Sequence, residues 1–236
     1  MGAQLRLLDS DGVSPFVSHN YGNVLAGAQS VPKLVFVNSY GDVAAEECEF
    51  GVEAVAGNDG YLFTEFCSAN EINAVALTVT GVVGTSGGSI AAGAAIQYKV
   101  AVADRWGNES EPCPSAYSPT FSAGTTNKVD LSWGAVAGAF KYVVYANANG
   151  TGYYKLGETP TNSFSDLTGA NDGTTVPRGA GSVAYVEGTW QTTPIDFATL
   201  AIGAKRPVTV RENVPLGITS SGNPRQHKCY VAFLAT

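Results

Sequence analysis

The side chains that could carry acid–base or metal chemistry are few and scattered along this chain. Carboxylates cluster in the segment Glu46–Glu49 and at Glu109 and Glu111, and the histidines are His19 and His227. Glycoside hydrolysis needs two carboxylates about 5–10 Å apart across a cleft, whereas acidic residues in one turn or strand more often form a solvated face. The histidines lie far apart in sequence among polar residues and turns. We therefore expect exposed carboxylates and histidines rather than a catalytic pair.

The sequence motifs that mark common catalytic sites do not occur. There is no G-x-x-x-x-G-K-[ST] phosphate loop, no G-x-S-x-G elbow and no H-E-x-x-H pair. The segment Asp9–Gly12 resembles the start of a calcium loop, but Asn20 stands where such a loop needs a bidentate Glu. We predict a simple turn there, and expect no enzymatic activity, no cofactor and no bound metal.

The four cysteines show no C-x-x-C spacing and no neighbouring His pair, so they do not indicate a zinc site. Three of them, Cys48, Cys67 and Cys229, lie beside strand-like runs, where a buried free thiol behaves as a small hydrophobic group. The fourth, Cys113, falls in a proline-rich segment that we expect to be an extended edge. Free thiols are expected, although the sequence alone leaves the disulfide state open.

Five aromatic residues outside the expected core could stack on sugars or pack against a partner. Alternation along a strand sends only one ring of a Tyr-Tyr pair inward, which leaves the other as a surface contact. The candidate surface contacts are Trp106, Tyr117, Tyr153, Tyr154 and Trp190.

Charge and hydropathy exclude two classes of partner. The formal net charge is −7 and no run of Lys or Arg occurs, so nucleic-acid binding is disfavoured. No stretch reaches eighteen apolar residues, so we expect no membrane-spanning segment. The first residues carry no apolar run of the length of a secretory signal, so we expect a protein made and assembled in a cytoplasm.

The pattern of turns and alternating apolar residues predicts an all-β protein. The chain has 28 Gly and 11 Pro, and turn clusters recur every eight to twelve residues. Two runs, Val129–Trp133 and Phe140–Tyr145, alternate with period two and predict strands. We expect Trp133 to be the centre of a core, surrounded by Tyr98, Val100, Leu131, Tyr142 and Val144.

Three motifs in this region resemble a fibronectin type III module. They are L-S-W at Leu131–Trp133, G-A-x-x-Y-x-V-Y at Gly138–Tyr145 and S-F-S-D-L-T-G at Ser163–Gly169. Together with the preceding Y-K-V-x-V run at Tyr98–Val102, they look like the fibronectin-type insertions common in structural proteins of tailed bacteriophages. The segment Asn20–Val55 is similar to the immunoglobulin-like repeats that phage virion proteins carry.

The resemblance implies two immunoglobulin-like or fibronectin type III-like β-sandwiches, one inserted in the other. The inserted sandwich, residues 79–177, is expected to project. The discontinuous sandwich, residues 1–78 with 178–236, is expected to dock. Three sandwiches in a row are the rival arrangement.

The implied function is that of a non-enzymatic structural component of a phage virion. It would act in a symmetric assembly, through contacts with other virion proteins and further copies of itself. Head decoration, neck, tail and baseplate all use such modules, so the position in the virion, the symmetry and the copy number stay open. The alternative is a glycan-binding adhesion module on a phage appendage or a bacterial surface, which would bind a host surface glycan.

Overall fold

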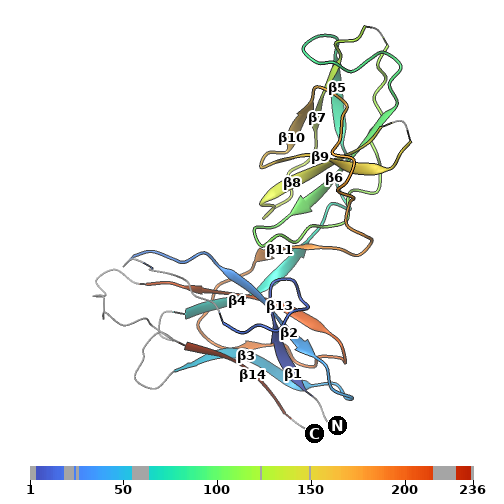
Figure 1. Ribbon diagram of the computed structural model, residues 1–236. Coiled ribbons are helices and arrows are strands. Elements are labelled where there is room, and N and C mark those ends of the chain that lie inside the picture. The colour runs from blue at the N-terminus through green and yellow to red at the C-terminus, as the bar shows by residue number, and fades with distance from the viewer. Residues whose placement is uncertain are drawn as a thin grey trace. The chain divides into compact units, whose positions relative to one another are not determined.

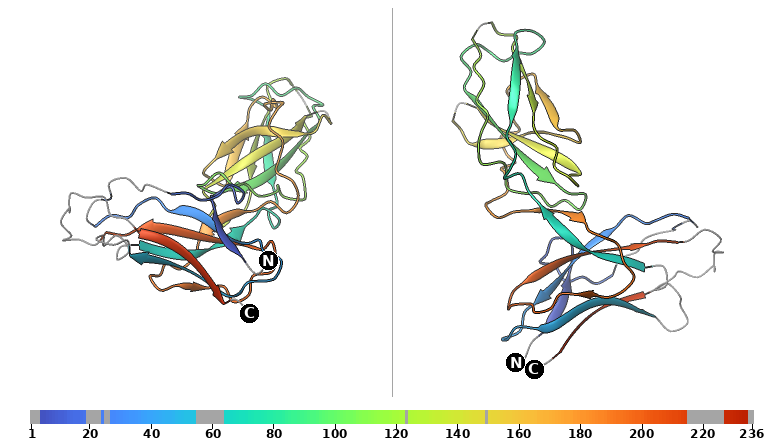
Figure 2. Two further views of the ribbon diagram at one scale, coloured as in Figure 1. Left: turned by 60° about the horizontal axis from the view of Figure 1, so that its bottom comes forward. Right: turned by 180° about the vertical axis from the view of Figure 1, so that it is seen from behind.

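The computed structural model describes residues 4–18, 24, 27–54, 64–122, 124–148, 150–214 and 227–234 (Figures 1 and 2). Every regular element in these residues is a β-strand, and no helix among them could span a membrane. The prediction of an all-β protein is therefore confirmed. The strands are β1 (Leu5–Leu8), β2 (Lys33–Ser39), β3 (Glu46–Ala54), β4 (Thr64–Ile72), β5 (Thr80–Gly84), β6 (Ile96–Ala103), β7 (Lys128–Ser132), β8 (Lys141–Ala148), β9 (Tyr153–Thr159), β10 (Ser163–Asp166), β11 (Ala184–Glu187), β12 (Ile195–Asp196), β13 (Lys205–Glu212) and β14 (His227–Leu234).

The chain divides into two compact units. Unit 1 comprises residues 1–70 and 187–236, and unit 2 comprises residues 71–186. The sequence placed these boundaries at 78/79 and 177/178, eight or nine residues nearer the middle of the chain. The structural boundaries fall inside β4 and β11, which are neighbours in one sheet.

The hydrophobic core of unit 1 is formed by residues from two antiparallel sheets. One sheet has the order β1-β2-β13-β4-β11, and the other has the order β12-β3-β14. Alternate residues of the first sheet, such as Val35, Val208 and Phe66, share one hydrophobic cluster with Phe50 of the second. The rings of Phe50 and Phe66 meet edge to face, with centroids 5.6 Å apart. The C-terminal strand β14 pairs with β3, so both ends of the chain contribute strands to this unit.

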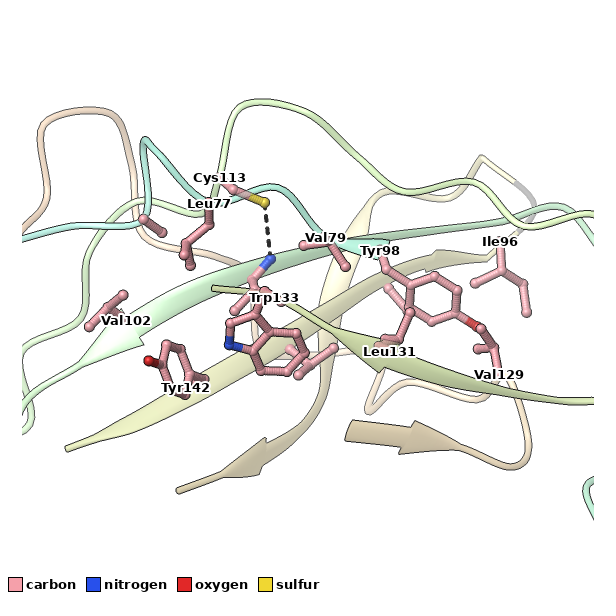
Figure 3. Packing of buried hydrophobic residues seen from close by; sticks show 14 of the residues in the cluster. Leu77, Val79, Ile96, Tyr98, Val102, Cys113, Val129, Leu131, Trp133 and Tyr142 are labelled. Atoms are coloured by element: carbon pink, nitrogen blue, oxygen red, sulfur yellow. Dashed lines mark hydrogen bonds between the residues drawn. The ribbon is translucent and has the colours of Figure 1, made fainter. Parts of the chain in front are cut away.

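The core of unit 2 is likewise formed by residues from two antiparallel sheets. Their strand orders are β10-β7-β5 and β6-β8-β9. Trp133 is 4% exposed and lies edge to face with Tyr142, with ring centroids 5.4 Å apart (Figure 3). All five neighbours expected for Trp133 belong to this cluster, so the predicted core is confirmed. Period-two alternation succeeds here because each strand sends every second side chain to the same face.

The second face of β8 is buried as well, which alternation alone does not indicate. Val143 and Tyr145 form a smaller cluster with Ala101 and Ala103 of β6. Each of these four residues is at most 3% exposed. The following strand β9 adds the partly buried ring of Tyr153 to this cluster.

Strand β5 begins only at Thr80, because the residues before it make a turn. Asn73 Oδ1 accepts a hydrogen bond from the backbone N–H of Val75 over 3.1 Å, and Leu77 N–H bonds to Ala74 O over 3.0 Å. An Asn side chain that bonds the backbone two residues on favours a turn over a strand.

Candidate functional site

The acidic segment at the N-terminus is a turn, as predicted, and lysine side chains bond to it. Lys33 Nζ forms an ion pair with Asp9, and Lys205 Nζ donates to the carbonyl of Gly12. Asp11 accepts hydrogen bonds from the backbone of Val13 and Ser14, 2.8 Å each, and from the Ser14 hydroxyl, which lowers its pKa to about 2. Among the described residues, no group of three or more His, Cys, Asp or Glu side chains is arranged to hold a metal ion.

The four cysteines are free thiols, so the expectation of unpaired cysteines is confirmed. Cys48 and Cys67 are buried as predicted, whereas Cys229 is only partly buried. Cys113, in the proline-rich segment that we expected to be an extended edge, lies fully buried in the core of unit 2. Burial raises the pKa of all four thiols, that of Cys229 to about 12, so they remain neutral at physiological pH.

Neither histidine side chain can be placed in a site, because His19 and the side chain of His227 lie outside the described residues. Of the acidic groups, Glu46 and Glu47 are exposed and Glu49 is half-buried.

Glu109 departs from the expected solvated face. Its Oε1 accepts a hydrogen bond from the Tyr145 hydroxyl over 2.6 Å. Burial raises the pKa of Glu109, although this bond and the nearby charges of Arg178 and Lys155 oppose the rise. The pair fixes the loop after β6 to the second face of β8.

A second carboxylate, which is fully buried, holds the same loop in shape. Asp104 is 2% exposed and accepts hydrogen bonds from the backbone N–H groups of Trp106, Asn108 and Tyr185, over 2.8, 2.9 and 3.1 Å. The side-chain amide of Asn108 adds a fourth bond of 2.9 Å. The local chemistry of Asp104 is therefore that of a loop organiser.

The five aromatic candidates are all half-buried. Tyr117 packs on the core of unit 2 and donates to the carbonyl of Gly81 over 2.8 Å. Tyr153 packs against the smaller cluster on β8 and donates to Gln97 Oε1 over 3.1 Å. Its neighbour Tyr154 pairs with Ala146. Trp106 belongs to the loop that Asp104 organises.

Trp190, the one candidate in unit 1, belongs to a polar cluster. The guanidinium carbon of Arg211 lies 4.0 Å from the centroid of the Trp190 ring. Arg211 also donates from Nε and Nη2 to Glu65 Oε2, over 2.8 and 2.6 Å, and from Nη1 to Gln29 Oε1 over 2.8 Å. Asn213 Nδ2 donates to Glu65 Oε1 over 2.6 Å. We call these five residues the Trp190 cluster.

Strand register brings the members of the Trp190 cluster together. Arg211 and Glu65 are directly opposite in the β13–β4 pair, although 146 positions separate them in sequence. A bridge between Gln191 and Phe66 holds the segment that carries Trp190 beside β4. Sequence reasoning singled out Trp190 but missed its partners, because no local pattern indicates which residues face each other across strands.

No protein-family model matches this chain, and no curated protein or solved structure is significantly similar to it.

Proposed function

We propose that this chain is a non-enzymatic structural component of a tailed-bacteriophage virion. We further propose that unit 1 is an immunoglobulin-like β-sandwich. Unit 2, which is inserted in it, is a fibronectin type III-like β-sandwich. The protein acts through contacts with other virion proteins and with further copies of itself in a symmetric assembly.

The main support for this proposal is that the motifs that resemble phage structural proteins contribute side chains to one common core. The Y-K-V-x-V run lies in β6, the L-S-W motif at the end of β7 and the G-A-x-x-Y-x-V-Y motif at the start of β8. Their side chains Tyr98, Trp133 and Tyr142 are buried in one cluster. The residues that carry the resemblance thus work as a scaffold, which supports a role through surfaces.

The insertion itself also supports the proposal. The chain leaves unit 1 in β4 and returns to it in β11, and these strands are neighbours. An insertion is tolerated where its two ends lie close together in the host. Within this proposal we assign docking to unit 1 and projection to unit 2.

Labelling of particles tests the assignment to a virion. Antibodies raised against the purified chain should decorate phage particles from the host lysate at a fixed position, seen by immunogold electron microscopy. Antibodies raised against an unrelated cytoplasmic host protein serve as the control. Label confined to soluble protein, with bare particles, would show that the chain is not a virion component.

Deletion of unit 2 tests which of the two units docks on the particle. Residues 71–186 are replaced by a short Gly/Ser linker, which joins β4 to the segment after β11. If unit 1 docks, particles should still incorporate the shortened chain in normal amount. A shortened chain that keeps its β-sheet circular dichroism and cooperative melting, yet is lost from particles, would assign docking to unit 2.

A further inference from the structure

We propose that the Trp190 cluster binds an uncharged hexopyranose unit of a surface polysaccharide, with the sugar's C–H face against the face of the Trp190 indole opposite Arg211. This inference goes beyond the assembly role proposed above and does not depend on it.

The indole ring is held in place before a ligand arrives. Trp190 is half-buried, and Arg211 lies against its ring at 4.0 Å, a cation–π contact. Because the ring is already oriented, binding a sugar loses little side-chain entropy. The π face of an aromatic ring carries partial negative charge, which suits the weakly positive C–H groups on one face of a pyranose.

The polar groups beside the ring are equally preorganised. Arg211 and Glu65 are held by bonds of 2.6–2.8 Å, and their side chains are 15% and 20% exposed. Three of the five N–H groups that a guanidinium carries are engaged by described residues, and a carboxylate has about four acceptor positions. Sugar hydroxyls both donate and accept, so they match this mixture of planar donors and acceptors.

Charge and polarity select the class of ligand. The charges of Arg211 and Glu65 offset each other in a direct ion pair, so the cluster favours a neutral sugar over a phosphate or an acidic sugar. Its other members, Gln29 and Asn213, are amides.

The test is saccharide binding by the full chain. We would screen it on an array of neutral bacterial polysaccharides and neutral hexose oligosaccharides, and titrate each hit by intrinsic tryptophan fluorescence. At least one neutral probe should bind. Trp190→Ala should weaken that binding by about tenfold or more, a change of about 1.4 kcal/mol. Trp106→Ala, which alters another half-buried tryptophan in unit 2, should leave the Kd unchanged.

Two further variants guard against a folding artefact. Trp190→Phe keeps an aromatic face and should retain part of the affinity while leaving the melting temperature near that of the parent. Arg211→Lys keeps the positive charge but loses the planar fork, so it should weaken binding and reduce the response of Trp190 fluorescence.

Several results would overturn the proposal. They are the absence of any neutral probe with a Kd below about 10 mM, a preference for anionic probes alone, or unchanged binding in a folded Trp190→Ala variant. Loss of a protein partner rather than of a saccharide in that variant would assign the cluster to protein contacts. None of these results bears on whether the chain decorates particles, so the two proposals fail separately.

Discussion

Tyr98 donates its phenolic hydrogen to Asp166 Oδ2 over 2.7 Å, which joins β6 of one sheet to β10 of the other. The two residues are 0% and 2% exposed. The second oxygen of Asp166 accepts from the backbone N–H groups of Thr168 and Gly169, over 3.0 and 2.8 Å. Burial and the Asp166 carboxylate raise the pKa of Tyr98, so the phenol stays neutral and remains a donor.

Removing the Tyr98 hydroxyl should therefore destabilise unit 2. Tyr98→Phe leaves a buried carboxylate oxygen of Asp166 without its donor, which should lower the free energy of unfolding by about 1–3 kcal/mol. Urea denaturation measures this. Tyr117→Phe removes a hydroxyl whose acceptor is the carbonyl of Gly81 at a half-buried position, so it should cost only about 0.5–1.5 kcal/mol. Equal effects of the two variants would contradict the special role of the Tyr98–Asp166 bond.

Truncating the central tryptophan should have the largest effect. Trp133→Ala removes a buried ring from the core of unit 2 and should cost about 3–5 kcal/mol. The indole Nε1 of Trp133 is buried and has no hydrogen-bond partner among the described residues. Trp133→Phe therefore loses no hydrogen bond and should cost clearly less than the alanine variant. Thermal and urea unfolding of both variants check this, and a Trp133→Ala variant as stable as the parent would show that Trp133 is not central to the core.

Gly138 is a position where a side chain has no room. Its φ is +81°, and an added Cβ would lie 2.4 Å from Cγ2 of Val186. Gly93 has a similar φ of +75°, but an added Cβ there would meet nothing within 4 Å. Gly93→Ala should thus cost about 1 kcal/mol for backbone strain alone, and Gly138→Ala about 1–3 kcal/mol more for overpacking. The difference in urea midpoint between these variants measures the steric part, and equal midpoints would rule it out.

The half-buried Glu109 should give the protein a dependence of stability on pH. Because its pKa is raised in the folded state, Glu109 stabilises the fold at pH values below the ordinary carboxyl range. That contribution is lost as the pH rises through the raised pKa of the folded state. Glu109→Gln removes the titration and keeps an oxygen that can accept from Tyr145, so the variant should gain stability relative to the parent as the pH rises.

Glu158 provides a control of opposite sign. The hydrogen bond and ion pair with Lys141, and then Lys155, lower the pKa of Glu158. Its contribution is therefore present above the ordinary carboxyl range and is lost as the pH falls through the lowered pKa. Stability curves of Glu109→Gln and Glu158→Gln should diverge from the parent in opposite directions. Parallel pH profiles for parent and Glu109→Gln would contradict the burial of that carboxylate.

Local sequence chemistry was sufficient to predict the all-β class, the strands β7 and β8, and much of one core. Leu131 and Trp133 alternate with polar residues, and this period-two pattern correctly sends both to the buried face of β7 and its end. Turn chemistry likewise predicted the Asp9–Gly12 turn. These features depend on residues within a few positions of each other, so they can be predicted from the sequence alone.

Tertiary structure decided the features that join distant segments. Val143 and Tyr145 are buried on the second face of β8 beside Ala101 and Ala103 of β6, and the loop that carries Glu109 returns to bond the Tyr145 hydroxyl. Arg211 meets Glu65 only through the register of β13 on β4. Burial and pairing of this kind depend on which distant segments close over a strand. That choice is made by the free energy of the whole packed unit, and a local pattern of residue types does not encode it.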